Sequence, residues 1–322
     1  MGDAPASPKA AQSRGMSAPS PGTPAPALLS PTALSHDPPT THDAWAGTPH
    51  GRLFTRRWTP GPAAPGASPS GTAPLPVVLF HDSLGCVELW RDFPAALCAA
   101  TGRDVIAYDR LGFGRSDART APMPPDFIGE EALTSLPALR AQLGFDRFAA
   151  LGHSVGGAMA AHCAADGGTG RATPTGSGSG GGCEALVTVA AQACVEERTL
   201  EGIRAARDQF DRSPEALQRL ARYHGGDEAR ARWVLGAWVD TWLHPDFAQW
   251  SQAGVLARVQ CPVLALHGDQ DEYGSTEQPA RIARWAAGPA RVEILPGAAH
   301  VPHRERPQDL AQRVARFLAD LP

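Results

Sequence analysis

The chain has 322 residues, of which 43% are hydrophobic, so it is long enough to bury a sizeable core. Its 29 basic and 33 acidic side chains leave a formal net charge of −4, which argues against a broad basic face that binds nucleic acid. No stretch approaches the ~20 consecutive apolar residues that a transmembrane helix requires, so we expect no membrane association.

Three segments of low complexity divide the chain. Residues 1–44 are mostly Ala, Pro, Ser, Thr and Gly, which bury too little apolar area to offset the entropy cost of ordering, so we predict disorder there. Gly61–Pro74 is a second such segment, and the Gly/Ser-rich stretch 166–183 predicts a flexible insertion. We expect an ordered core in two parts, at 45–190 and 251–322.

Short apolar runs alternate with helical stretches along this core. The runs VVLF, LVTVA and PVLAL lack polar alternation, which is typical of parallel strands covered on both faces. Strand–helix alternation predicts an α/β fold with a mostly parallel central sheet flanked by helices. The predicted strands are Val77–Phe80, Asp104–Asp109, Phe148–Gly152, Ala185–Ala190, Pro262–His267 and Arg291–Leu295. The predicted helices are Glu88–Ala100, Phe127–Leu143, Val155–Ala165, Thr276–Ala287 and Pro307–Asp320.

The segment 191–250 breaks this alternation. From about Cys194 onward it has only helical periodicity, and it contains four of the eight tryptophans. Two interpretations remain open: the tryptophans form the core of a small helical subdomain, or some of them line an apolar substrate pocket. The candidates for substrate contact are Trp233, Trp238 and Trp242.

The strongest chemical signal is a G-x-S-x-G motif between an apolar strand and an Ala-rich helix. It runs from Gly152 to Gly156 and has Ser154 at its centre. A serine at such a sharp turn is exposed at the carboxyl edge of the sheet, next to a helix N-terminus. The small flanking residues let the strand and the helix approach closely. We therefore predict that Ser154 is a nucleophile.

A serine hydroxyl needs a base that takes its proton, and that base needs an oriented partner. Carboxylates follow the strand at 262–267, and two histidines follow the last predicted strand. Both groups come directly after strand ends, where the functional loops of an open α/β sheet collect. The acid candidates are Asp269 and Asp271, and the base candidates are His300 and His303.

Together, these motifs resemble the α/β-hydrolase fold superfamily, of the kind that has a helical cap inserted after the sixth strand. The segments His81–Gly85 and Asp109–Asp117 also carry the resemblance, which extends over about 45–322 in the expected order. It implies a cap at 191–250. It further implies Asp271 as the acid, with Asp269 as the alternative, and His300 rather than His303 as the base.

The resemblance also implies an oxyanion hole formed by the backbone N–H groups of Ser83 and Val155. Asp82 stands where the family usually has glycine, which eases an unusual backbone conformation at that position. Asp tolerates left-handed geometry better than most residues, so we expect the loop to survive. A carboxylate near the pocket would discourage anionic substrates or would serve as an additional polar group.

Serine at the centre of the motif favours acyl chemistry, since the dehalogenases and epoxide hydrolases of the superfamily carry Asp there. We predict hydrolysis of an ester, thioester or lactone of a small, apolar substrate through an acyl-serine intermediate. The same residues would support carbon–carbon bond hydrolysis, perhydrolysis or acyl transfer. A non-catalytic binding module with this fold is the alternative from another class, with Asp82 as its only support.

The six cysteines show neither C-x-x-C spacing nor a Cys/His pattern of metal ligands. We therefore expect no metal, no cofactor and a small-molecule substrate as the partner. The scattered thiols fit a reducing compartment, and the N-terminus lacks the plan of a secretory signal peptide, so we expect a cytoplasmic protein.

Overall fold

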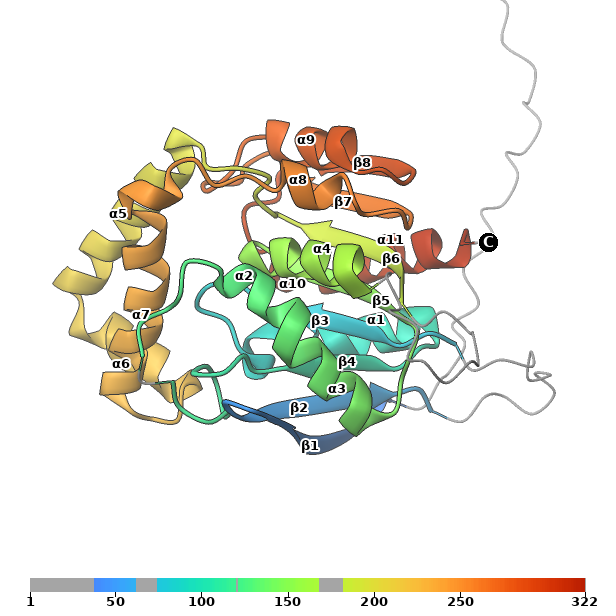
Figure 1. Ribbon diagram of the computed structural model, residues 1–322, viewed down its shortest axis with the longest axis horizontal. Coiled ribbons are helices and arrows are strands. Elements are labelled where there is room, and N and C mark those ends of the chain that lie inside the picture. Colours follow the sequence, from blue (N-terminus) through green and yellow to red (C-terminus); the bar gives the residue numbers. More distant parts are fainter. Residues whose placement is uncertain (1–37, 62–73, 120, 168–181, 322) are drawn as a thin grey trace, which may run out of the picture. The chain divides into compact units, whose positions relative to one another are not determined.

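An eight-stranded sheet runs through the computed structural model (Figure 1). The structure describes residues 38–61, 74–119, 121–167 and 182–321, all within the unit that extends from His36 to Pro322. The predicted disordered and Gly/Pro-rich segments lie mostly outside the described residues. None of the helices in the described ranges is long and apolar enough to cross a bilayer.

The strands follow the order β1-β2-β4-β3-β5-β6-β7-β8 across the sheet. β2 pairs antiparallel with both β1 and β4, and the remaining neighbours are parallel. The strands are β1 Thr40–Thr48, β2 Gly51–Thr59, β3 Val77–Phe80, β4 Val105–Tyr108, β5 Phe148–His153, β6 Cys183–Val189, β7 Val263–Gly268 and β8 Ala290–Leu295. The six strands predicted from sequence are confirmed, Val77–Phe80 with the predicted ends and the other five with shifted ends.

Each central strand contributes side chains to two separate cores, one on each face of the sheet. In β3, Val77 and Leu79 belong to one cluster, whereas Val78 and Phe80 belong to the other. Because successive side chains of a strand point to opposite faces, a strand buried on both faces must be apolar at every position. This requirement explains the uninterrupted apolar runs in the sequence.

Helices cover both faces of the sheet (Figure 1). α1 (Phe93–Thr101) packs against α11 (Pro307–Ala319) on one face, over the cluster that contains Leu97 and Val314. The other face carries α3 (Leu136–Leu143), α4 (Val155–Gly167), α8 (Ala253–Leu256) and α9 (Glu277–Trp285). The shorter elements are η1 Val87–Trp90, α2 Phe127–Glu130, η2 Glu131–Ser135, η3 Pro245–Phe247 and α10 Pro302–Glu305.

The predicted helix Glu88–Ala100 is two elements, because the chain turns between η1 and α1. Arg91 has a positive φ of 54°, and Pro94 lies at the start of α1, where its missing N–H costs nothing. The predicted helix Phe127–Leu143 is likewise divided into α2, the π-helical turn η2 and α3.

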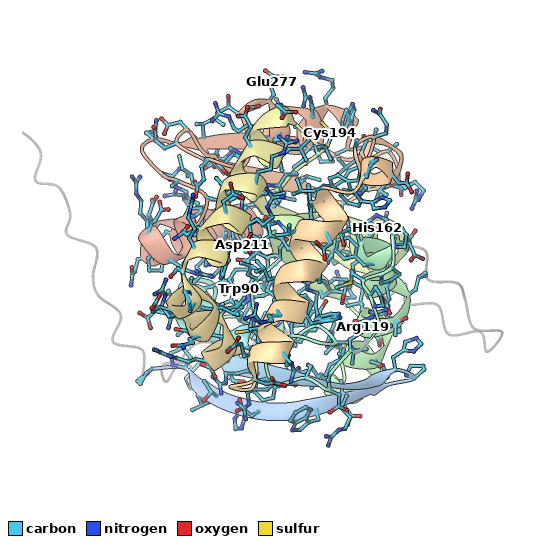
Figure 2. The ribbon with its side chains drawn as sticks, turned by 90° about the vertical axis from the view of Figure 1, so that its left-hand side faces the viewer. Trp90, Arg119, His162, Cys194, Asp211 and Glu277 are labelled. Atoms are coloured by element: carbon cyan, nitrogen blue, oxygen red, sulfur yellow. The ribbon has the colours of Figure 1, made fainter. Side chains whose placement is uncertain are left out.

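Between β6 and β7 the chain forms three long helices, α5 (Glu197–Arg212), α6 (Pro214–Tyr223) and α7 (Glu228–Trp242), before the short elements η3 and α8. We call these three helices the helical insertion. Ser213 caps α6 by accepting from the Ala216 N–H, and Asp227 caps α7 through the Ala229 N–H. Figure 2 is seen from the side of the helical insertion, with α5 and α7 in front of the sheet.

The prediction of disorder is wrong for residues 40–44, which belong to β1. β1 pairs with β2 along its whole length, and Asp43 forms ion pairs with Arg56 and Arg115. The strand is thus ordered by backbone pairing and by charged partners on β2 and beyond, although its first residues are exposed and polar. Its low apolar content is the reason why neither β1 nor β2 was predicted.

Candidate active site

Ser154 occupies the sharp turn between β5 and α4, with a φ of 55° that is rare for a residue with a side chain. The glycines around it have no room for a side chain. A Cβ on Gly156 would lie 2.1 Å from the Phe80 carbonyl oxygen, and one on Gly152 would lie 2.1 Å from the Gly156 carbonyl oxygen. Strand and helix therefore approach closely enough to hold this strained turn.

Three of the predicted site residues lie in one hydrogen-bonded chain. His300 Nε2 lies 3.1 Å from Ser154 Oγ, and His300 Nδ1 lies 2.9 Å from each carboxylate oxygen of Asp271. An ionised carboxylate only accepts, so Nδ1 carries the ring proton and Nε2 is free to accept from the serine hydroxyl. The arrangement can take a proton from Ser154.

Asp271 is buried and well supplied with donors. Its Oδ1 accepts from the N–H groups of Tyr273 and Gly274, at 2.8 and 3.1 Å. Burial opposes ionisation, but hydrogen bonds from the His300 ring and from the Tyr273 N–H hold the pKa of Asp271 below its ordinary value. Asp271 is therefore a carboxylate at neutral pH.

The two alternatives left by the sequence lie elsewhere. Asp269 is exposed, and its Oδ1 accepts from the Gly297 N–H at 2.7 Å. His303 is buried with its ring against Trp90 and His153, at centroid distances of 4.9 and 4.4 Å. Asp271 and His300 are thus the pair that the structure brings to Ser154.

The loop from His81 to Gly85 runs beside Ser154, and Ser83 lines the same cavity as Ser154 and His300. Val155 follows Ser154 directly, as the first residue of α4. The expectation of left-handed geometry at Asp82 is wrong: among the described residues with a side chain, only Arg91, Ser154 and Ala190 have a positive φ.

Both carboxylate oxygens of Asp82 instead contact neighbouring polar groups. Oδ1 accepts from the Leu84 N–H at 3.0 Å, and Oδ2 lies 3.2 Å from His153 Nδ1. Its side chain lies over Gly85, where an added Cβ would come within 2.7 Å of Asp82 Oδ1. The loop therefore accommodates the carboxylate at 82 because residue 85 has no side chain.

A cavity of about 520 Å³ lies between Ser154 and the helical insertion. Trp238 and Trp242 line it, as predicted, together with apolar residues of α5 and α6. Trp233 does not: its ring packs on Phe113 at 5.6 Å, and its Nε1–H donates to the Ala121 carbonyl. An α-helix turns by about 100° per residue, so Trp233 lies about 140° around α7 from Trp238 and about 180° from Trp242. It therefore faces away from the cavity.

Most residues that line the cavity were not predicted, and three of them are polar side chains with notable contacts. Gln192 Oε1 lies 3.5 Å from Ser154 Oγ. Gln192 comes shortly after β6, and this position after a strand end could have indicated that it lies near the site. Tyr273 packs on the His300 ring at 4.7 Å, and burial raises its pKa to about 12, so its hydroxyl stays protonated. Arg91 is exposed and donates to the Tyr223 hydroxyl, and no motif marks it.

Comparisons with known proteins agree with this architecture. A family model for the alpha/beta hydrolase fold matches residues 76–191. The chain is 37% identical over 87 residues to the 1-acylglycerol-3-phosphate O-acyltransferase ABHD5 of Sus scrofa, which is 27% of this chain and 24% of that protein. It is 38% identical over 85 residues to the (Lyso)-N-acylphosphatidylethanolamine lipase of Bos taurus, which is 26% of this chain and 24% of that protein. These matches span about a quarter of the length of each relative.

Solved structures share the fold over most of the chain. The proline iminopeptidase of Mycobacterium smegmatis matches with a TM-score of 0.61 and 23% identity, over 86% of this chain and 98% of that one. The enol-lactonase of Burkholderia xenovorans LB400 matches with a TM-score of 0.60 and 19% identity, over 86% and 100%. The sheet order, the flanking helices and the family-model match over residues 76–191 show that the chain has the α/β-hydrolase fold.

Proposed function

We propose that the protein is a serine hydrolase that cleaves an ester, thioester or lactone of a small substrate. The observation that carries this proposal is the hydrogen-bonded chain from Ser154 through His300 to Asp271 at one wall of the cavity. A nucleophile, a base and an oriented carboxylate in contact are what acyl transfer to serine requires.

In the first half of the reaction, Ser154 Oγ attacks the substrate carbonyl while its proton passes to His300 Nε2. The negative oxygen of the tetrahedral adduct accepts from the Ser83 and Val155 N–H groups, a contact that is strongest in the transition state. The adduct collapses to an acyl-serine as His300 returns the proton to the leaving group. A water then repeats the sequence, with His300 as its base, and releases the acid.

The cavity supports a substrate with an apolar portion. Trp238 and Trp242 contribute aromatic surface, and Ile203 and Leu220 add aliphatic surface from α5 and α6. We propose that the helical insertion acts as a cap that shapes this binding site. The named activities of two relatives, a lipase and an enol-lactonase, also support acyl chemistry.

The test is a panel of p-nitrophenyl esters with the wild type, Ser154→Ala and Ser251→Ala. Ser251 is an exposed serine next to the base of the helical insertion and serves as the control. We expect Ser154→Ala to lose at least ~1,000-fold in kcat/KM, since removing a triad member typically costs more than that. Ser251→Ala should keep its activity, and all three proteins should have the same circular dichroism spectrum.

A fluorophosphonate probe distinguishes the remaining alternatives. It should label the wild type and leave Ser154→Ala unlabelled. Folded wild type without labelling and without turnover would contradict the proposal and favour a binding module. Acyl product that accumulates on an added alcohol, in preference to free acid, would show acyl transfer instead of hydrolysis. The cytoplasmic location and the small-molecule partner remain predictions, which cell fractionation and the ester panel address.

A further inference from the structure

The wall of the cavity that α6 forms is polar as well as apolar. The residues of α6 that line the cavity recur at intervals of three and four, which places them on one face of the helix: Ala216, Arg219, Leu220 and Tyr223. Arg219 and Tyr223 are one turn apart, so their side chains are neighbours on this face. The α6 wall therefore provides a guanidinium and a phenol hydroxyl beside its apolar residues.

A second guanidinium reaches the same place from a different segment. Arg91, on the turn between η1 and α1, also lines the cavity, and its Nη2 donates to the Tyr223 hydroxyl at 2.5 Å. Its guanidinium carbon lies 5.0 Å from the centre of the Tyr223 ring. Because Tyr223 contacts Arg91 and adjoins Arg219 on the helix, two positive charges lie around one hydroxyl.

Neither of these charges forms an ion pair with a carboxylate in the part of the chain that the structure describes. The third arginine of the cavity differs, because Arg304 lies 3.7 Å from Asp82 Oδ2. Glu215 lies one turn before Arg219, but its pKa is lowered mainly by hydrogen bonds and only to a smaller extent by the charge of Arg219. A guanidinium has five N–H donors, so Arg91 and Arg219 retain donors for an anion.

The backbone at Arg91 is strained. Its φ of 54° and ψ of −130° suit glycine and are unfavourable for a residue with a Cβ. Among the described residues with a side chain, only Ser154 and Ala190 share a positive φ, and Ser154 is the proposed nucleophile. Strain of this kind is concentrated at active sites and ligand-binding positions. An arginine where glycine would be relaxed therefore indicates a function for its side chain.

The carboxylates of the cavity lie at a different wall. Glu272 Oε2 accepts from the His300 N–H at 3.3 Å, and Asp82 lies beside His153, the residue before Ser154. A negative group of a substrate is repelled by these carboxylates and attracted by the arginines. This division of charge leaves the wall beside Ser154 for a neutral carbonyl. The expectation that Asp82 discourages anions thus concerns only that wall.

We infer that Arg91, Arg219 and the Tyr223 hydroxyl form a subsite for a carboxylate or phosphate group at the end of the substrate distant from the cleaved bond. Both groups present oxygen atoms that a guanidinium binds in a bidentate manner. Phe210 and Leu220 line the same cavity and supply apolar surface for the chain that joins the two ends. This inference rests on the proposed function, because it names the substrate class of that site.

The first experiment compares matched substrates. The mono-p-nitrophenyl esters of the linear dicarboxylic acids from succinic to suberic acid have a terminal carboxylate, and their methyl esters are the neutral counterparts. A second series of the same chain lengths has a terminal phosphate in place of the carboxylate. The series with the larger preference over its neutral counterpart identifies the group that the subsite binds.

At the chain length that reaches the subsite, we expect the wild type to prefer the anionic substrate ~10-fold or more in kcat/KM, through a lower KM. The preference should decrease in high salt, since salt screens exposed charges. Equal or lower kcat/KM for the anionic substrate at every chain length, in both series, would overturn the subsite.

Variants test which arginines provide the preference. Arg91→Gly and Arg219→Ala should each reduce it by ~10-fold, because each removes charge-assisted hydrogen bonds. Arg222→Ala is the control: Arg222 is an exposed arginine of the same helix, but it does not line the cavity. A loss of preference in Arg222→Ala as large as in Arg219→Ala would assign the preference to net charge and overturn the subsite.

Arg91→Gly also distinguishes a ligand contact from a purely structural one. Glycine relieves the positive φ, so the urea midpoint of this variant should not fall, although the contact with Tyr223 is lost. A lower midpoint together with an unchanged preference for anionic substrates would show that Arg91 only attaches the helical insertion, and would contradict its role in the subsite.

A binding measurement separates the subsite from the proposed hydrolysis. Isothermal titration calorimetry of Ser154→Ala with the monomethyl and dimethyl esters of the same acids requires no turnover. We expect the monomethyl ester to bind ~10-fold more tightly, and Arg219→Ala in the same background to remove the difference. This result would support the subsite even for a protein without hydrolase activity. Turnover of neutral esters by the wild type, with no preference for anions in either measurement, would leave the hydrolase proposal intact and overturn the subsite.

Discussion

Asp271 accepts hydrogen bonds from one side chain and two backbone N–H groups, so its orientation is fixed independently of His300. That orientation determines which nitrogen of His300 carries the proton. With the proton held on Nδ1, Nε2 presents its lone pair to Ser154 Oγ. In the proposed reaction, the carboxylate thus keeps the ring in the one tautomer that can accept the serine proton.

Replacing Asp271 by Asn should lower kcat by ~10³- to 10⁴-fold, because an amide donor opposite Nδ1 favours the wrong tautomer. Asp269→Asn is the control: its Oδ1 can still accept from Gly297, and the residue has no contact with the His300 ring in the described structure. Steady-state kinetics on the best ester of the panel measures both. An equal loss in the two variants would contradict the assignment of Asp271.

At the same scale, positions after strand ends predicted Ser154 and the candidates for its partners, and the family resemblance favoured Asp271 over Asp269 and His300 over His303. The sequence could not predict the contacts of Asp82, which depend on where the side chain of His153 lies after folding. The two residues are far apart in the chain, and only the packing of β3 beside β5 brings them together. The substitution was visible in the sequence, but its partner was not.

At the scale of the elements, helix α7 contacts the cavity with one face and the loop at Gly112 with the opposite face. One face brings Trp238 and Trp242 to the cavity, where Trp242 also packs on Phe247 at 5.1 Å. The other face places Trp233 over Gly112, where an added Cβ would lie 2.5 Å from the indole ring. A single helix therefore both lines the cavity and attaches the helical insertion to the loop at Gly112.

Trp238→Ala should raise KM for esters with bulky acyl groups about 10-fold, because it removes apolar contact area from the cavity. Trp233→Ala should leave KM unchanged and lower the free energy of unfolding by about 2 kcal/mol, less than for a fully buried tryptophan. Michaelis–Menten kinetics and urea unfolding on both variants test this. A KM effect of Trp233→Ala as large as that of Trp238→Ala would contradict the division of faces.

The strands of the core could be predicted because they are buried on both faces and must be apolar throughout. β1 and β2 could not, since β1 lies at the sheet edge and its order depends on backbone pairing with β2. Similarly, the break between η1 and α1 depends on the positive φ of Arg91, a residue with no preference for that conformation. Burial leaves a pattern in sequence, whereas pairing and strained turns often do not.

For the molecule as a whole, several histidines are buried in their neutral form. His224 is an example with a clear tautomer: Nδ1 accepts from the Gly114 N–H at 2.8 Å, and Nε2 donates to the Leu84 carbonyl at 3.2 Å. Burial lowers its pKa to about 4. Burial also lowers the pKa of His81, His267 and His303.

These shifts predict that stability falls on acidification. Between the folded pKa of about 4 for His224 and an unfolded pKa of about 6.5, the unfolded chain binds more protons, so the free energy of unfolding decreases as pH falls. From pH 7 to pH 5 this residue should account for about 2 kcal/mol. Asp109, whose pKa burial raises to about 6, acts in the opposite direction over the same range.

The contribution of His224 is isolated by comparing variants. Urea unfolding at pH 7 and pH 5 should show a loss for the wild type that is larger than for His224→Gln by about 2 kcal/mol. His42→Gln, at an exposed histidine of β1, should behave like the wild type. Equal pH dependence in His224→Gln and the wild type would mean that His224 is already charged or exposed in the folded state.

The two ends of the segment that contains the helical insertion meet at its base. Cys194 and Ser251 form an antiparallel bridge, the Gln252 N–H donates to the Ala193 carbonyl at 2.8 Å, and the Val195 N–H donates to the Trp250 carbonyl at 3.4 Å. Because the chain leaves and rejoins the sheet at one closed neck, this segment can be lengthened, shortened or exchanged while the strands on either side keep their register, since loop-closure entropy changes slowly with length. Recombination at this neck would join a different insertion to an unchanged Ser154 turn, so the walls of the cavity would change in one event.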